Sequence, residues 1–189
     1  MQNRTVKRRD HMAKQHSDRQ ALQQSEFAGR LFADYQGDGE MPLAGYATLL
    51  GIYNAAFAGL LLAVKQTGRQ LPKQFSYADL VLLSLSTYKL SRIISKDRVT
   101  SPLRAPFTEY EGPAGASEVK EKVRGDGMQR AVGDLLTCPW CLGPWVAGAL
   151  AVGLIFRPRA TRLLGGVFAA VAVSDFLQHA TAAIKKSEQ

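Results

Sequence analysis

Two long stretches without any charged side chain constrain this chain more than any other feature. Met41–Val64 contains no Asp, Glu, Lys or Arg, and Cys138–Phe156 is a second such stretch. A helix rises ~1.5 Å per residue, so about 20 apolar residues cross a hydrocarbon core about 30 Å thick. The mean hydropathy of the whole chain is −0.11, a value typical of a soluble protein. The average is this low because strongly polar segments offset the two apolar stretches. The sequence therefore predicts at least two membrane-spanning helices.

Two further apolar stretches carry charges inside them. Phe75–Ile94 contains Asp79, Lys89 and Arg92, and Leu163–Ile184 contains Asp175 and His179. Beside two charge-free spans, the simplest interpretation is an all-α membrane protein. We expect this protein to be a four-helix transmembrane bundle with spans at about 41–64, 75–94, 138–156 and 163–184. Residues 1–40 then form a flexible basic cytoplasmic tail, 41–189 form the membrane domain, and 95–137 form its inner loop.

The distribution of Lys and Arg predicts the orientation of the spans in the cell membrane. With the N-terminus inside, seven lie in 1–40, seven in 95–137 and two in the C-terminal tail, against six on the opposite side. An excess of positive charge marks the cytoplasmic side of a membrane protein. We therefore expect a multi-pass protein with both termini in the cytoplasm.

Charges within the spans need partners, because an unpaired charge in the hydrocarbon layer costs several kcal/mol. Lys89 lies twelve residues after Tyr77, and Asp175 lies twelve residues after Leu163, so each is about 18 Å along its helix from the outer face. We expect a structural ion pair in which Asp175 meets Lys89 or Arg92. The alternative is that both cations extend to the inner headgroups.

Small residues recur every fourth position in three of the stretches, which predicts close helix packing in the bilayer. They are Gly51, Ala55, Gly59 and Ala63; Gly143, Ala147 and Ala151; and Gly166, Ala170 and Ser174.

The inner loop has the pattern of a small folded unit. Phe107–Glu111 and Glu118–Arg124 read as two strands around a GPAGAS turn, with Lys and Arg facing Glu109 and Glu111. The Gly125-Asp126-Gly127 break favours a hairpin over a helix, and Asp126 is placed to cap a short helix at 128–136.

Cys138 and Cys141 form a CPWC dithiol at the predicted start of a helix, where Pro139 suits the first helical position. A helix N-terminus favours thiolate, as a reversible disulfide requires. One CxxC also supplies two of the four ligands of a zinc site, which His11 and His16 or a second copy would complete. A structural or interfacial pair, a redox pair and a zinc site remain open.

The runs SPLRAPFTEYEG and GDLLTCPWCLGPW resemble the bacterial family called domain of unknown function 1360. These are small integral membrane proteins that include a Bacillus sporulation protein. The resemblance covers roughly 77–178. Its matching positions are Arg92, Asp97, Pro102, Arg104, Pro106, Phe107, Glu109, Gly133, Leu135, Cys138, Pro139, Cys141 and Trp145. The resemblance implies a membrane protein and brings no catalytic residue.

Several function classes lack their signature in this chain. The net charge of +8 raises nucleic acid as a partner, but no aromatic residue lies among the first six Lys and Arg to form a stacking surface. No nucleophile–base set, phosphate loop or cofactor fingerprint is present. We therefore expect a non-catalytic protein, with no cofactor assigned, whose tail and loop dock a cytosolic protein. The alternatives are a membrane thiol–disulfide oxidoreductase using Cys138 and Cys141, and a zinc-bridged dimer; a homo-oligomer also stays open.

Overall fold

A computed structural model of the chain describes residues 41–68, 71–115 and 117–187. The predictions for the basic tail, including His11 and His16, lie outside the described residues. Among the described residues, the long helices are α2 (Leu43–Gln66), α3 (Tyr77–Lys96), α6 (Pro139–Phe156) and α7 (Pro158–Ser187). The shorter elements are η1 (Arg98–Thr100), α4 (Ser101–Arg104), β1 (Thr108–Pro113), β2 (Val119–Val123) and α5 (Gly127–Thr137).

The described part of the chain is mostly helical, and three of its helices are long and apolar enough to cross a membrane: α2, α6 and α7. The second expected span, α3, is not among these three, because serine and charged residues interrupt its apolar run. The helix itself exists and matches the predicted stretch to within two residues at each end. The structure therefore supports three candidate spans and leaves the fourth as a prediction.

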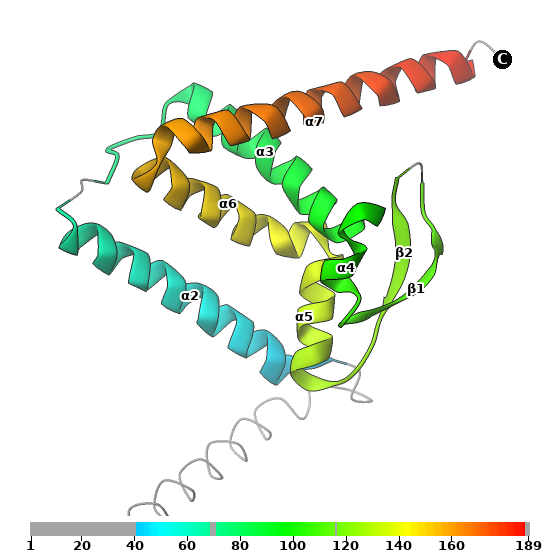
Figure 1. The fold of residues 1–189 in the computed structure, drawn as a ribbon, viewed down its shortest axis with the longest axis horizontal. Helices are drawn as coiled ribbons and strands as arrows, with labels where there is room; N and C mark the ends of the chain where they lie inside the picture. The colour runs from blue at the N-terminus through cyan, green and yellow to red at the C-terminus, as the bar shows by residue number, and fades with distance from the viewer. Residues whose placement is uncertain (1–40, 69–70, 116, 188–189) are drawn as a thin grey trace, which may run out of the picture. The chain divides into compact units, whose positions relative to one another are not determined.

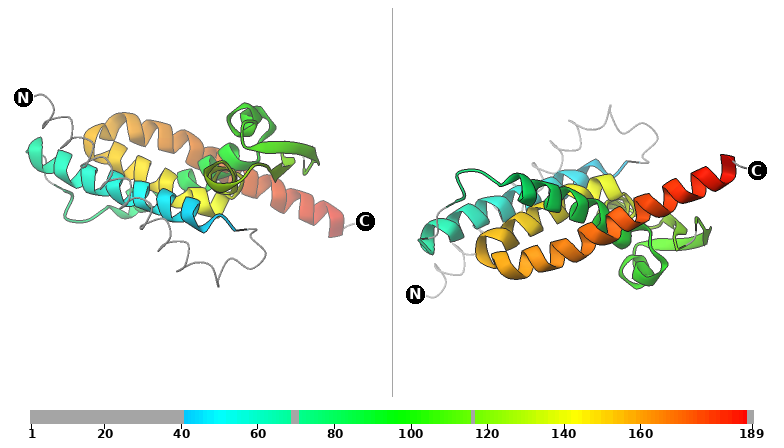
Figure 2. Two further views of the ribbon diagram at one scale, coloured as in Figure 1. Left: turned by 90° about the horizontal axis from the view of Figure 1, so that it is seen from below. Right: turned by 90° about the horizontal axis from the view of Figure 1, so that it is seen from above.

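Helix α3 packs against both α6 and α7 (Figures 1 and 2). Its buried residues are serines, and the Ser86 hydroxyl donates to the carbonyl of Gly165 on α7 at 2.7 Å. A Cβ added at Gly165 would lie 2.7 Å from Leu82 Cδ2, so any larger residue would require Leu82 to shift. The prediction that Gly166 lies on the contact face of α7 is wrong by one position. A Cβ added at Gly166 would have nothing within 4 Å.

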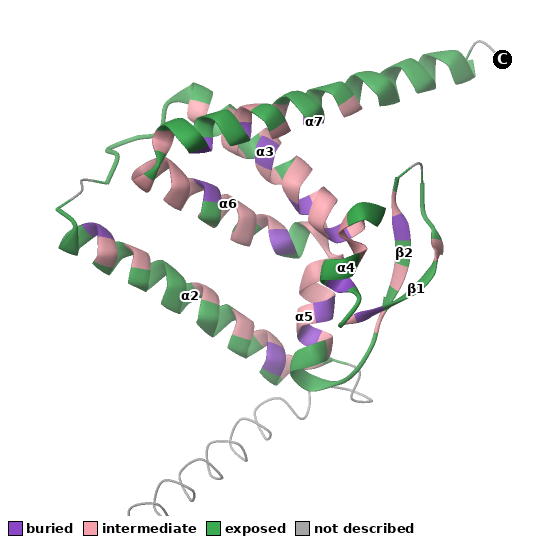
Figure 3. Cartoon of the chain, viewed as in Figure 1, coloured by how far each residue is buried: buried purple, intermediate pink, exposed green. Residues whose placement is uncertain are grey.

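Helix α2 is attached mainly near its start. Gly45 lies against α5, because an added Cβ would be 2.6 Å from the Ala131 Cβ. The Tyr46 hydroxyl donates to Asp134 Oδ2 at 2.7 Å. Figure 3 shows that most of α2 is exposed, with only Gly45 and Val64 buried. The tightly packed unit is therefore α3, α6 and α7, and the expected four-helix bundle is not confirmed.

The inner loop folds into the predicted antiparallel hairpin. Glu109 pairs with Lys122 in the register, and Lys120 Nζ lies 3.1 Å from Glu111 Oε2. A bulge between Tyr110 and Gly112 extends β1 two residues beyond the predicted strand. The predicted helix follows as α5. Asp126 is its N-cap residue, although its side chain makes no capping hydrogen bond.

Candidate functional site

A cleft of about 480 Å³ is lined by α3, α7 and the turn of the hairpin. We call it the charged cleft and define it by the six Lys, Arg, His, Asp and Glu residues that line it. They are Lys89, Arg92, Asp97, Glu118, Asp175 and His179. Three segments that are distant in the sequence supply them: α3 and its C-terminal cap, the residue preceding β2, and α7. The hairpin therefore helps to build a site whose other walls are long helices.

Two ion pairs organise the charged cleft. Lys89 Nζ lies 2.7 Å from Asp175 Oδ2, and the two side chains are 15% and 30% exposed. Beside them, the rings of Tyr88 and Phe176 stack with centroids 5.2 Å apart. Arg92 pairs with Glu118 instead of Asp175, so it ties α3 to the hairpin. Lys89 and Arg92, the two partners predicted for Asp175, thus bind different carboxylates in the structure.

Asp97 differs from the other carboxylates of the charged cleft. It caps the C-terminus of α3, and its backbone forms a bridge with Glu118. Its carboxylate forms no ion pair within the described residues. Burial raises the pKa of Asp97 above its ordinary value, and the positive charge of Lys89 opposes this effect. Asp97 is therefore a partly desolvated carboxylate that faces an open cleft.

A buried arginine holds the hairpin to the end of α3. Arg104 is 0% exposed, and its Nε and Nη2 bind the two carboxylate oxygens of Glu121 at 2.6 and 3.2 Å. Nη1 donates to the carbonyl of Ile94 at 2.6 Å, and Nη2 donates to the carbonyl of Asp97 at 3.0 Å. The last carbonyls of a helix lack partners within the helix, so Arg104 satisfies them. We call Arg104, Glu121 and the carbonyls of Ile94 and Asp97 the arginine node.

Sequence reasoning did not assign a role to Arg104. The available signal was Glu121, which shares the inward face of β2 with Val119 and Val123 and is the only charged residue there. A carboxylate on a buried face requires a cation. A further pair that was not predicted joins Arg162 on α7 to Asp79 at the start of α3, at 2.9 and 3.0 Å.

The CPWC motif begins α6 as predicted. Cys138 is the N-cap residue, Pro139 follows it, and Cys138 and Cys141 form a disulfide with their Cα atoms 5.2 Å apart. The Cys141 backbone N–H donates to Cys138 Sγ at 3.2 Å. Cys141 and the intervening Trp140 are exposed, the latter at 84%. Cys141 is therefore placed at the surface, whereas Cys138 is half-buried.

No group of three or more His, Cys, Asp or Glu side chains within the described ranges could hold a metal ion. A zinc site on Cys138 and Cys141 would need further ligands from outside those ranges or from a second copy. The zinc-bridged dimer stays a prediction.

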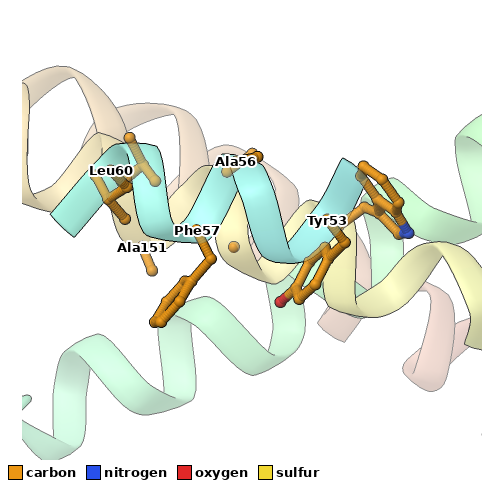
Figure 4. A pocket seen from close by; sticks show the side chains of 9 residues that line it. Tyr53, Ala56, Phe57, Leu60 and Ala151 are labelled. Carbon is orange, nitrogen blue, oxygen red and sulfur yellow. The ribbon is translucent and has the colours of Figure 1, made fainter. Parts of the chain in front are cut away.

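A second cavity, an apolar groove of about 270 Å³, lies between α2 and α6 (Figure 4). Tyr53 and Phe57 come from α2, and Ala151 comes from α6. The Tyr53 ring meets Trp145 edge-on at 5.2 Å. Its lining is almost entirely apolar, so this groove suits hydrocarbon.

The fold and site define a class: a helical protein with helices able to cross a membrane, joined to a small hairpin by buried ionic contacts. The chain belongs to the family described as Protein of unknown function (DUF1360), whose model matches residues 82–181. The matched region starts within α3 and ends within α7, so it contains the charged cleft, the arginine node and the CPWC motif but not α2. The expected family membership is confirmed.

Two curated relatives come from Bacillus subtilis (strain 168). "Sporulation protein YjcA" is 35% identical over 88 residues, which cover 45% of this chain and 75% of that protein. "UPF0713 protein YngL" is 30% identical over 87 residues, which cover 46% of this chain and 65% of that protein. No solved structure matches the chain.

Proposed function

We propose that this chain is a multi-pass protein of the cell membrane in which α2, α3, α6 and α7 all cross the bilayer. Of these four helices, α3 is the one too polar to be a candidate membrane span by its own length and composition. Two of its polar side chains are satisfied by α7: Ser86 donates to the carbonyl of Gly165, and Lys89 pairs with Asp175. Polar groups are tolerated in lipid where neighbouring helices satisfy them. The proposed topology places the termini, the hairpin and α5 in the cytoplasm.

In this topology the protein acts as a non-catalytic membrane anchor whose hairpin docks a cytosolic protein. The observation that supports this role is the arginine node, which fixes an otherwise marginal two-stranded hairpin to a long helix. An isolated two-stranded hairpin is barely stable in water, so a buried ionic anchor gives it a defined surface. That surface carries Tyr110, which is 65% exposed. The tail 1–40 would add a second contact with the same partner.

Site-specific photo-crosslinking in living cells tests the docking role. A photoreactive amino acid at Tyr110 should give one discrete crosslinked product, and the matched substitution at Tyr77 should not give it. Tyr77 is also exposed, but it lies at the opposite end of α3. Removing residues 1–40 should weaken the product while membrane insertion persists. Absence of a product at Tyr110, or the same product at Tyr77, would contradict the docking role.

The disulfide supports a second candidate, a membrane thiol–disulfide oxidoreductase. A substrate thiolate would attack one sulfur of the Cys138–Cys141 disulfide, forming a mixed disulfide and releasing the other cysteine as a thiolate. A second substrate thiol would then release the substrate as a disulfide and leave the chain as a dithiol. In the reverse direction Cys138 attacks, and the amide that donates to its sulfur stabilises its thiolate.

Thiol trapping tests this second candidate. If Cys138 attacks and Cys141 resolves, Cys141→Ser should accumulate a mixed disulfide, whereas Cys138→Ser should not. Reducing and non-reducing electrophoresis of acid-quenched membranes reveals the adduct. A structural disulfide would give no adduct in either variant.

A further inference from the structure

The charged cleft reaches from the proposed cytoplasmic surface into the inner leaflet. Asp97 lies at the end of α3, and Lys89 lies eight residues earlier, which is about 12 Å along the helix. Asp175 and His179 are four residues apart on α7, so they lie on one face of that helix. In a bilayer, the polar groups available at this depth belong to lipid headgroups. This inference rests on the proposed membrane placement.

The charge of the cleft selects among headgroups. Two cations, Lys89 and Arg92, face three carboxylates, so with neutral His179 the formal sum is −1. Lys89 and Arg92 each pair with one carboxylate, which leaves Asp97 as the acceptor for an additional ammonium group. A purely anionic headgroup would add to the negative excess.

Donors for a phosphate are also present. A guanidinium has five N–H donors, and the contact with Glu118 uses Nη2, so Nε and Nη1 of Arg92 can serve a ligand. The Arg92 side chain is 38% exposed, so a ligand can reach it. His179 is exposed on the opposite wall. A molecule with one ammonium and one phosphate matches both halves of the cleft.

We propose that the charged cleft binds the headgroup of phosphatidylethanolamine from the cytoplasmic leaflet. Its ammonium group lies at Asp97, and its phosphate lies between Arg92 and His179. Phosphatidylcholine is disfavoured because its trimethylammonium group has no N–H donor for the carboxylate. Phosphatidylglycerol is disfavoured because it supplies no cation for Asp97.

Native mass spectrometry of the detergent-purified full chain, titrated with each lipid, tests the proposal. Wild type should bind one phosphatidylethanolamine about tenfold more tightly than phosphatidylcholine or phosphatidylglycerol, the effect of one charge-assisted hydrogen bond. Asp97→Asn keeps the side-chain shape and removes the charge. It should lose the preference for phosphatidylethanolamine and bind phosphatidylglycerol more tightly than wild type does. The matched control Asp126→Asn, at an exposed position outside the cleft, should behave as wild type.

A reversal of lipid preference cannot come from loss of folding, which would weaken all three lipids together. His179→Gln provides a second variant at an exposed position. It should weaken all three lipids several-fold, because each carries the phosphate, while the preference for phosphatidylethanolamine persists. Equal binding of the three lipids by wild type would overturn the proposal, and so would an unchanged preference in Asp97→Asn. If free glycerophosphoethanolamine binds as tightly as phosphatidylethanolamine, the ligand is a soluble headgroup compound and not the lipid, and the proposal is wrong. Because these measurements use micelles, their failure is distinct from failure of the topology, which accessibility labelling tests separately.

Discussion

Replacing Arg104 with methionine should release the hairpin from α3. Methionine matches the length of the aliphatic stem but leaves Glu121, whose side chain is 7% exposed, as a buried charge without its partner. It also removes the donor to the carbonyl of Ile94 at 2.6 Å, whereas the carbonyl of Asp97 still accepts from Thr100. Breaking a buried ion pair by removing one partner costs about 3–5 kcal/mol. The cost should fall on the hairpin and not on the α3–α7 contact, which does not involve Arg104.

Hydrogen–deuterium exchange of the reconstituted protein measures this effect locally. Since about 1.4 kcal/mol corresponds to a factor of ten, the amides of β1 and β2 should exchange at least about 100-fold faster in Arg104→Met. Arg124→Met, an exposed arginine at the end of the same hairpin, should change exchange less than about threefold. The double variant with Glu121→Met should recover about tenfold, because no charge is then left buried. Hairpin exchange within about fivefold of wild type in Arg104→Met would refute the anchoring role.

Three further changes probe the helix contacts and the charged cleft. Gly165→Ala should lower the free energy of unfolding by about 1–3 kcal/mol through overpacking, whereas Gly166→Ala should be neutral or slightly stabilising in the same thermal melt. Lys89→Met alone should cost about 3 kcal/mol, and adding Asp175→Leu should restore most of it; additive losses in this cycle would argue against the pair. Because burial raises the pKa of Asp97 above 3.8, the folded state binds its proton more tightly than the unfolded state does. The contribution of Asp97 to stability therefore falls as pH rises through that raised pKa. The difference between the free energies of unfolding of wild type and Asp97→Asn, measured against pH, should show this slope. Parallel profiles for the two proteins would contradict it.

The sequence predicted the long helices and the hairpin because their signals are local. Charge-free runs of helical length, an alternating strand, and glycines beside Asp126 each restrict the backbone over a few residues. The start of α6 at Pro139 was predictable for the same reason. The charge distribution also identified Lys89 and Asp175 as needing a partner.

Features that depend on three-dimensional register were not predictable. The spacing of small residues suggested Gly166, but the packed face of α7 runs through Gly165 and Ala172, and one position rotates a helical face by about 100°. The partner of Arg92 required knowing that the hairpin folds back onto α3. Arg104 appeared only as a position shared with a family, because its partners lie on both sides of it in the sequence.

The central claim is that α3 crosses the membrane despite its polarity, which places the hairpin and the α2–α3 connection on opposite sides. In a Cys138→Ser/Cys141→Ser background, single cysteines at Lys73 and Lys122 can be labelled with a membrane-impermeant maleimide. We predict that Lys73→Cys reacts in intact cells, and that Lys122→Cys reacts only after the membrane is permeabilised. Reaction of both positions from the same side would contradict the account.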